Sequence, residues 1–232
     1  MEHVNGLNNL DLSISDFDLG HRFLAYVNYQ IEYLNHAATT FSIFYNGQSG
    51  MPYSYIYDDN NSKVNGGNGV TGWTKENEGA MIYIPQAKDE IVFKDAATSD
   101  AQWEALNAFI EGDKYLSKHR GEYAARNGAR TPFENMIDLK IAQDFFVRAG
   151  ATKHKLQLTL DIFNLANLLN SNWGPKYYAY VNTMQLITFE GFAADGTTPT
   201  FSFKTPKSIY SVDDSGIRAS RWMAQIGVRY SF

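Results

Sequence analysis

The stretch WMAQIGVRYSF, residues Trp222–Phe232, ends the chain and shows a strict alternation of side chains. One set is apolar or aromatic and consists of Trp222, Ala224, Ile226, Val228, Tyr230 and Phe232. The intervening residues are mostly polar or small. Successive side chains of an extended chain point to opposite faces, so a period of two predicts a β-strand with one apolar face.

Four earlier stretches repeat this alternation. In His21–Tyr33, for example, Phe23, Val27 and Ile31 share one face, and Leu24 is an exception on the other. This run is longer than the ~5–6 residues usual for a strand of a globular protein. The five expected strands begin near His21, Ala38, Phe133, Lys155 and Ser220.

The connections between these strands alternate between short and long. We expect an initial loop at residues 1–19, short turns at Leu34–Ala37 and Ala149–Lys153, and long excursions at residues 58–132 and 165–219. Short turns at one end and long loops at the other are typical of transmembrane barrels, whose long loops are extracellular. The sequence therefore predicts an all-β fold, part of an antiparallel up-and-down transmembrane β-barrel.

The first excursion contains one expected helix, at Ser99–Glu111. Ser99 followed by Gln102 fits a capping box, and Trp103, Leu106, Phe109 and Ile110 form an apolar stripe. Before the excursion, the second strand is expected to bend at Gly47–Gly50 and to continue through Pro52–Tyr57. The alternating tyrosines of that extension favour an aromatic girdle at the lipid interface.

Composition excludes several classes of function. The net charge of -5 argues against nucleic acid as a partner, because phosphate binding needs clustered cations. Cysteine is absent, and the 5 histidines are scattered without zinc-site spacing, so we expect no metal and no cofactor. Paired acids such as Asp89 and Glu90 point opposite ways on an extended chain, and nothing converges with them. We therefore expect no enzymatic activity.

Five strands do not complete a barrel. Lipid offers no hydrogen-bond partner to an open sheet edge, and single-chain bacterial barrels have at least eight strands. No signal peptide is visible, because Met1–Leu10 is polar. We therefore expect further barrel strands in sequence upstream of Met1, and we expect Trp222–Phe232 to lie at an edge or to pair only with the strand near Lys155.

At this point the residues resemble a known family. The chain is similar to the C-terminal barrel region of Bacteroidetes TonB-dependent outer-membrane receptors, in the Oar-like branch that carries a carboxypeptidase-regulatory-like domain. The segments that carry the resemblance are Asp18–Arg22 (DLGHR), Phe44–Tyr57 (FYNGQSGMPYSYIY), Met81–Phe93 (MIYIPQAKDEIVF), Asp113–Arg130 (DKYLSKHRGEYAARNGAR), Thr131–Glu134 (TPFE), Leu158–Leu169 (LTLDIFNLANLL) and the aromatic end. An acidic DxNxDG-like loop of the family is reduced here to two leading acids in Asp58–Gly69.

The resemblance implies a barrel of about 22 strands with an internal plug in the bacterial outer membrane. It implies energised uptake of a large nutrient, such as an oligosaccharide, a peptide or a metal chelate. The expected partners are outer-membrane lipid, the N-terminal strands and plug, and TonB through that N-terminal part. The last strand resembles an insertion signal read by the barrel assembly machinery, carried by Trp222, Ile226, Val228, Tyr230 and Phe232.

Ligand contacts are expected in the long loops. The candidates are Trp73, Trp173, Tyr177, Arg120, Arg126 and Arg130. For the arginines the alternative is a set of salt bridges to lumenal Asp138, Asp144 and Asp161, and for the aromatic residues it is a lipid girdle. The alternative function for the whole chain is a soluble β-sandwich or adhesin-like module that binds glycans.

Overall fold

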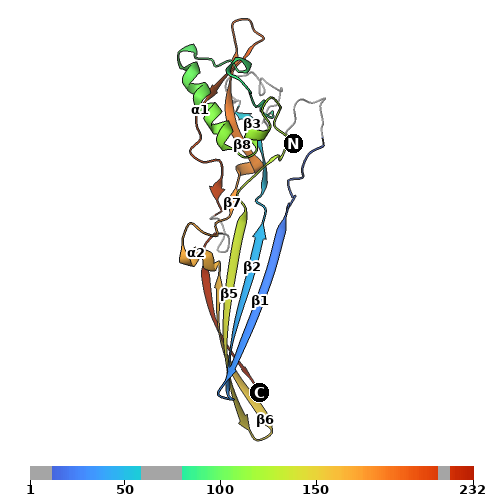
Figure 1. Ribbon diagram of the computed structural model, residues 1–232, viewed down its shortest axis with the longest axis vertical. Coiled ribbons are helices and arrows are strands. Elements are labelled where there is room, and N and C mark those ends of the chain that lie inside the picture. Colours follow the sequence, from blue (N-terminus) through green and yellow to red (C-terminus); the bar gives the residue numbers. More distant parts are fainter. Residues whose placement is uncertain (1–11, 59–79, 214–219) are drawn as a thin grey trace. The chain divides into compact units, whose positions relative to one another are not determined.

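The computed structural model describes residues 12–58, 80–213 and 220–232 (Figure 1). The described part is rich in β-strand and short in helix, so the all-β class predicted from the sequence is confirmed. None of the helices described combines the length and the apolar character that a membrane crossing requires. The described part divides into two compact units, one of residues 19–50, 132–177, 212–213 and 220–232, the other of residues 12–18, 51–58, 80–131 and 178–211.

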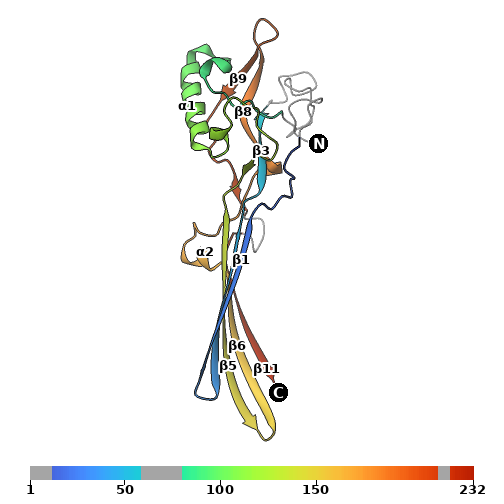
Figure 2. The ribbon, with the colours of Figure 1, turned by 45° about the vertical axis from the view of Figure 1, so that its right-hand side comes forward.

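The first unit is built on a five-stranded antiparallel sheet. Its strands are β1 (Arg22–Tyr33), β2 (Ala37–Gln48), β5 (Glu134–Ala149), β6 (Thr152–Phe163) and β11 (Met223–Ser231). Their spatial order is the order in which they occur along the chain, β1-β2-β5-β6-β11, as Figure 2 shows. Among the described strands β11 pairs with β6 alone, which confirms the edge position predicted for the last strand.

The two short turns predicted from the sequence are present. The turn after β1 places Leu34 and Asn35 at φ of 56° and 52°, and the turn after β5 uses Gly150 at φ 65°. Positive φ at these positions gives hairpin turns whose twist matches that of the flanking strands. Both turns therefore hold long, regular strand pairs in one register.

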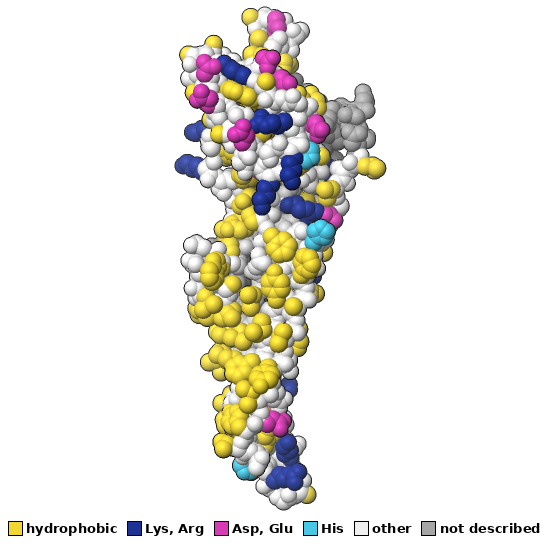
Figure 3. Space-filling model, in the orientation of Figure 1, with side chains coloured by type: hydrophobic (Ala, Val, Ile, Leu, Met, Phe, Trp, Pro, Cys, Tyr) yellow, Lys and Arg dark blue, Asp and Glu magenta, His cyan; other side chains and the backbone are white. Residues whose placement is uncertain are grey.

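The register brings the apolar faces of all five strands onto one face of the sheet. One row across the sheet runs Tyr29–Phe41–Ile141–Leu160–Ile226. Figure 3 shows apolar side chains gathered over this sheet, and we call this surface the apolar face. Its members are exposed: Ile226 keeps 80 % and Val228 70 % of its surface accessible.

The opposite face of the sheet is polar and internally paired. The Asp144 carboxylate lies 2.8 Å from Lys155 Nζ and accepts a 2.8 Å hydrogen bond from Gln157 Nε2. Lys140 Nζ lies 3.0 Å from the carboxylate of Asp161. Each pair joins neighbouring strands, so the polar face is stabilised by cross-strand contacts of opposite charge.

The second unit has its own sheet and its own hydrophobic core. The sheet order is β4 (Ala129–Arg130), β3 (Pro52–Asp58), β8 (Thr183–Phe192) and β9 (Pro199–Phe203), with β3 and β8 parallel. Helix α1 (Ser99–Gly112) lies beside β9 in both ribbon views. Its other elements are η1 (Lys88–Glu90), η2 (Ala96–Thr98), η3 (Leu116–Lys118) and η4 (Tyr180–Asn182). Helix α2 (Leu165–Leu169) belongs to the first unit, and the strands β7 (Tyr177–Tyr178) and β10 (Ser211–Val212) pair with each other.

Two local predictions fail in this second unit. Pro52–Tyr57 does not extend the second strand, because β3 belongs to a separate sheet. Its tyrosines do not form a girdle either: Tyr53, Tyr55 and Tyr57 are at most 8 % exposed and belong to the core. A tyrosine ring packs in a core when its hydroxyl finds a partner, and here Tyr55 donates to Asp113 Oδ2 at 2.7 Å.

The predicted helix is confirmed, but its capping box is not. Thr98 occupies the N-cap position without a side-chain cap bond, and Ser99 is already helical. Gln102 is used differently, because its Oε1 accepts a 2.8 Å hydrogen bond from the Phe203 amide of β9. The apolar stripe faces the core as expected, with Leu106 and Ile110 buried.

Candidate ligand-binding cleft

One side of the candidate cleft is a turn that follows α2. Trp173 N donates to Asn170 O at 2.9 Å, which closes the turn. Asn167 Nδ2 donates to Ser171 O and Trp173 O, both at 3.1 Å. The backbone around Trp173 is therefore fixed by local hydrogen bonds, although the indole itself is 56 % exposed.

The buried side chain of Asn164 holds the turn through hydrogen bonds. This residue is 2 % exposed and adopts a left-handed backbone at φ 53°. Its backbone N–H donates to Asp138 Oδ1 at 2.8 Å, and its Nδ2 donates to Gly174 O at 3.1 Å and Ser220 O at 3.4 Å. A Cβ at Gly174 would lie 2.2 Å from Asn164 Oδ1, so the close approach of turn and amide requires glycine.

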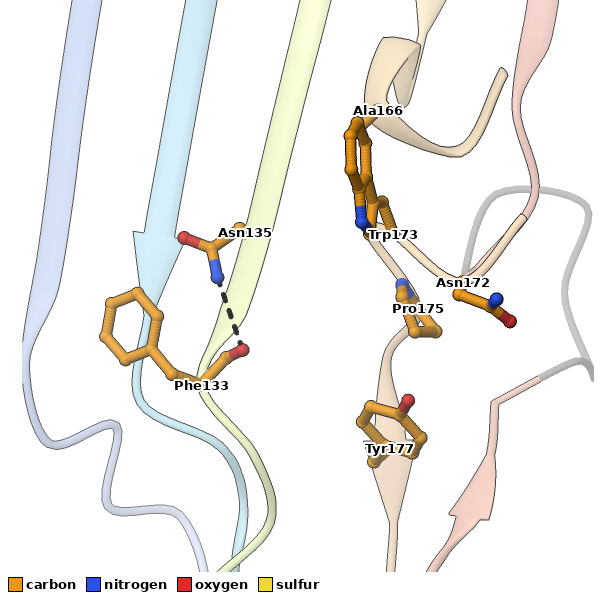
Figure 4. Close-up of a pocket in the computed structure, with 8 residues that line it drawn as sticks. Phe133, Asn135, Ala166, Asn172, Trp173, Pro175 and Tyr177 are labelled. Carbon is orange, nitrogen blue, oxygen red and sulfur yellow. Dashed lines mark hydrogen bonds between the residues drawn. The ribbon is translucent and has the colours of Figure 1, made fainter. Parts of the chain in front are cut away.

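The cleft itself has a volume of about 370 Å³. It is lined by Phe133, Asn135, Ala166, Asn172, Trp173, Gly174, Pro175 and Tyr177. Figure 4 shows Phe133 and Asn135 on one side and Trp173, Pro175 and Tyr177 on the other. The volume lies within the ~300–1,000 Å³ range of small-molecule sites.

The chemistry of this lining is aromatic and amide, without an acidic or basic side chain. Three aromatic rings offer flat apolar surface. Asn172 adds an exposed side-chain amide, while Asn135 Oδ1 already accepts from Tyr45 Oη at 2.8 Å. Such a lining suits a neutral ligand with an apolar face and hydroxyl or amide groups, and it offers no counter-charge to an ionic one.

The predicted ligand-binding residues fall into separate groups. Trp173 and Tyr177 line the same cleft. Trp73 lies outside the described residues. Arg120, Arg126 and Arg130 belong to the other compact unit.

Each of these arginines is engaged within its own unit. Arg120 donates to Pro85 O at 3.1 Å and Asn107 Oδ1 at 2.7 Å. Arg126 lies 3.0 Å from the Asp16 carboxylate, and Arg130 is ion-paired with Asp18. Asp138 accepts a hydrogen bond from the Asn164 amide, and Asp144 and Asp161 are ion-paired with Lys155 and Lys140. The alternative of salt bridges from the arginines to these carboxylates stays a prediction.

Sequence reasoning missed most of the cleft. Phe133 and Asn135 come from the start of β5, and Gly174 and Pro175 come from the turn. The SNWGP run at 171–175 carries a turn signal. Nothing in the sequence shows that this turn faces a strand end some 40 residues away.

The strand predicted as an insertion signal is exposed at the sheet edge. Phe232 is 85 % exposed, and its ring centroid lies 5.7 Å from that of Tyr230. The Tyr230 hydroxyl lies 2.6 Å from His154 Nδ1 of β6. The aromatic end is thus accessible to another protein or to lipid.

Buried tyrosines carry the main electrostatic feature of the second unit. Burial raises the pKa of the Tyr57 hydroxyl to about 12. Burial, with the neighbouring Tyr53 and Asp113, raises the pKa of Tyr55 further, and burial is also the main cause of the raised pKa of Tyr53. These hydroxyls therefore stay neutral over the physiological range.

No metal centre is formed within the described ranges, where no three His, Asp or Glu residues cluster in a way that could hold an ion. Comparison with models of known protein families, with curated proteins and with solved structures finds no match for this chain. What the fold defines is an all-β chain with an open sheet, one exposed apolar face and an uncharged aromatic cleft.

Proposed function

We propose that this chain supplies the last five strands and two extracellular loop regions of a TonB-dependent transporter in a bacterial outer membrane. The observation that carries the proposal is the continuous, exposed apolar face of the five-stranded sheet. Monomeric soluble proteins rarely expose a contiguous apolar patch larger than about 300–600 Å². In a membrane such a face contacts lipid chains, so no other protein surface has to pack against it.

The dimensions of the apolar face agree with this proposal. From Phe23 to Tyr33 there are about ten residue steps of ~3.3 Å, or roughly 33 Å along the strand. A strand tilt of about 40° reduces this to roughly 25 Å across the membrane, the height of the apolar band of outer-membrane barrels. Aromatic residues lie at both limits of the band, with Phe23 at one end and Tyr33 and Tyr230 at the other.

A soluble β-sandwich is the weaker candidate. It would need a second sheet against the apolar face, because each large side chain buried there would contribute about 1.5–3 kcal/mol. The four-stranded sheet does not supply that cover, because its apolar residues already form a core with α1. The remaining sheet among the described strands is the pair β7–β10, and its strands of two residues each are too short to cover this face.

In the proposed transporter the sheet closes with strands from other sequence, since lipid leaves no open edge. The paired charges of the polar face line the lumen around the plug. TonB acts through the N-terminal part, and the Trp173 cleft contributes to ligand capture. The C-terminal strand, ending in Phe232, is the contact for the assembly machinery, and uptake proceeds without covalent chemistry.

The topology is tested by thiol labelling of single cysteines placed in these 232 residues, which contain none of their own. Trp173→Cys reports the long-loop end of the sheet, and Ala151→Cys reports the short turn after β5. Each variant is expressed in the complete protein and treated in intact cells with a membrane-impermeant maleimide.

We expect Trp173→Cys to react in intact cells, and Ala151→Cys to react only after the outer membrane is permeabilised. Reaction of both positions in intact cells, or recovery of the protein in the soluble fraction, would contradict the proposal. Val212→Cys, which is also exposed and lies at the long-loop end, is the matched control for reactivity.

A further inference from the structure

The second unit carries a groove with a different aromatic lining. Its volume is about 240 Å³. It is lined by Tyr178, Tyr180, Thr183, Met184, Gln185, Ser208, Ile209, Tyr210 and Ser211. We call it the tyrosine groove. It shares no residue with the Trp173 cleft.

The groove has an apolar floor on a rigid base. Met184 and Ile209 pack against the hydrophobic core of the unit. Met184 lies in β8, where it pairs with Tyr55 of β3, one of the most deeply buried residues of the chain. Packing against the core therefore holds these two side chains in place.

The rim offers an exposed ring on a constrained backbone. Tyr180 is 70 % exposed. Its carbonyl accepts a 3.2 Å hydrogen bond from the Oγ1 of buried Thr183, and the η4 turn is closed by Asn182 N donating to Ala179 O at 3.1 Å. A tyrosine has only two side-chain torsions to fix, so on a constrained backbone it loses little freedom when it binds a ligand.

The groove carries no acidic, basic or histidine side chain. Its polar groups are hydroxyls and the exposed side-chain amide of Gln185. An ionic ligand would find no counter-charge there. A pyranose ring has one apolar face that stacks on an aromatic ring and equatorial hydroxyls that hydrogen-bond to amides and hydroxyls, so it matches both parts of the lining.

We infer that the tyrosine groove is a binding site for one sugar ring of a neutral oligosaccharide, with Tyr180 as the stacking platform and Gln185 as a hydrogen-bonding group. The volume lies below the ~300 Å³ of typical drug-sized sites, which fits a single ring of a longer chain. The inference concerns binding alone, so it does not depend on transport or on the membrane.

The test is isothermal titration of the complete protein in detergent with maltohexaose, cellohexaose and laminarihexaose. At least one of these neutral hexasaccharides is expected to bind. Tyr180→Ala should then weaken binding roughly tenfold, the loss of one aromatic contact. Tyr180→Phe should retain most of the affinity, because the ring face and not the hydroxyl makes the stacking contact.

A control substitution keeps the result specific. Tyr123→Ala removes another exposed tyrosine of the same unit that does not line the groove, and it should leave affinity within about twofold. Failure of all three sugars to bind, equal loss in Tyr123→Ala and Tyr180→Ala, or preference for an uncharged peptide over every sugar would overturn the inference.

Discussion

Gly174→Ala gives the sharpest prediction for the Trp173 cleft. Gly174 has a φ of +70°, and an added Cβ would lie 2.2 Å from Asn164 Oδ1. A left-handed backbone costs a non-glycine residue about 1–2 kcal/mol. Asn164 has no free space to retreat to, since it is 2 % exposed and its Nδ2 is bonded to Gly174 O and Ser220 O.

Moving the Asn164 amide breaks one or both of those hydrogen bonds, at about 0.5–1.5 kcal/mol each. The total for Gly174→Ala is therefore about 1.5–5 kcal/mol of local stability, by the sum of the two contributions. In hydrogen–deuterium exchange of the 165–175 segment, this corresponds to roughly 10-fold to several-thousand-fold faster opening. Ligand affinity at the cleft should fall in parallel.

Gly150→Ala is the matched control. Gly150 has a similar φ of +65°, but nothing lies within 4 Å of an added Cβ. It should therefore show the backbone cost of about 1–2 kcal/mol without the clash. In an Asn164→Gly background the clash is absent, so Gly174→Ala should cost only about the same 1–2 kcal/mol relative to Asn164→Gly alone. Equal effects of Gly174→Ala and Gly150→Ala would refute the close-approach reasoning.

Three further predictions concern ionisable groups. Asp144→Asn should lower the free energy of unfolding in urea by about 1–3 kcal/mol, because it weakens the ion pair with Lys155 and leaves the Lys155 charge uncompensated. An unchanged free energy of unfolding would show that the pair is not formed. The pKa values of Tyr53, Tyr55 and Tyr57 are raised in the folded state above the unfolded value of 10.0. The stability that their neutral hydroxyls give the second unit is therefore complete below about pH 10 and is lost as the pH rises further. The thermal midpoint of this unit should fall above about pH 10. Tyr57→Phe, which also loses the bond to Tyr83 N, should show a smaller alkaline decline than the natural chain. Hydrogen bonds from Thr198 and Thr197 lower the pKa of Asp195 from 3.8 to about 2. The turn between β8 and β9 should therefore be fully ordered above about pH 4 and should lose this order towards about pH 2. The amide chemical shifts of Thr197 and Thr198 follow this titration, and Asp195→Asn should abolish it.

The five-stranded sheet could be predicted because its signal is local. Alternation in Trp222–Phe232 and His21–Tyr33 depends only on the period of an extended chain. Short turns, such as the one at Gly150, fix the register of β1 with β2 and of β5 with β6. The pairs β2–β5 and β6–β11 form across the long connections, and their register has no such local signal. Strand positions and the apolar face were therefore accessible to sequence reasoning.

The second unit was less predictable because its contacts are non-local. Pro52–Tyr57 alternates like a membrane strand, but β3 is recruited to β8, more than 120 residues further along the chain. Alternating tyrosines do not distinguish a lipid girdle from a core in which their hydroxyls have partners. The partner of Tyr55, Asp113, lies in a loop whose position no periodicity reports.

Only a small part of the cleft was predicted. Trp173 and Tyr177 stand out as loop aromatics, but the amide that fixes their turn is Asn164, which follows β6 directly and has no distinctive sequence signal. The arginines stood out as a basic run, and each has a structural partner instead, such as Asp16 for Arg126. A run of basic residues in the sequence does not show which acidic residues will lie beside them in the fold.

A pair of lysine substitutions in β11 tests the central claim, that the apolar face meets lipid. Ile226 and Gln225 are neighbours on opposite faces and both are exposed, so contacts within the chain predict little effect for either change, within about 0.5 kcal/mol. The free energy of unfolding is measured in urea for the complete protein folded into phospholipid vesicles. If the apolar face meets lipid, Ile226→Lys costs about 2–4 kcal/mol and Gln225→Lys costs close to nothing. Equal, small effects of the two substitutions would contradict the account.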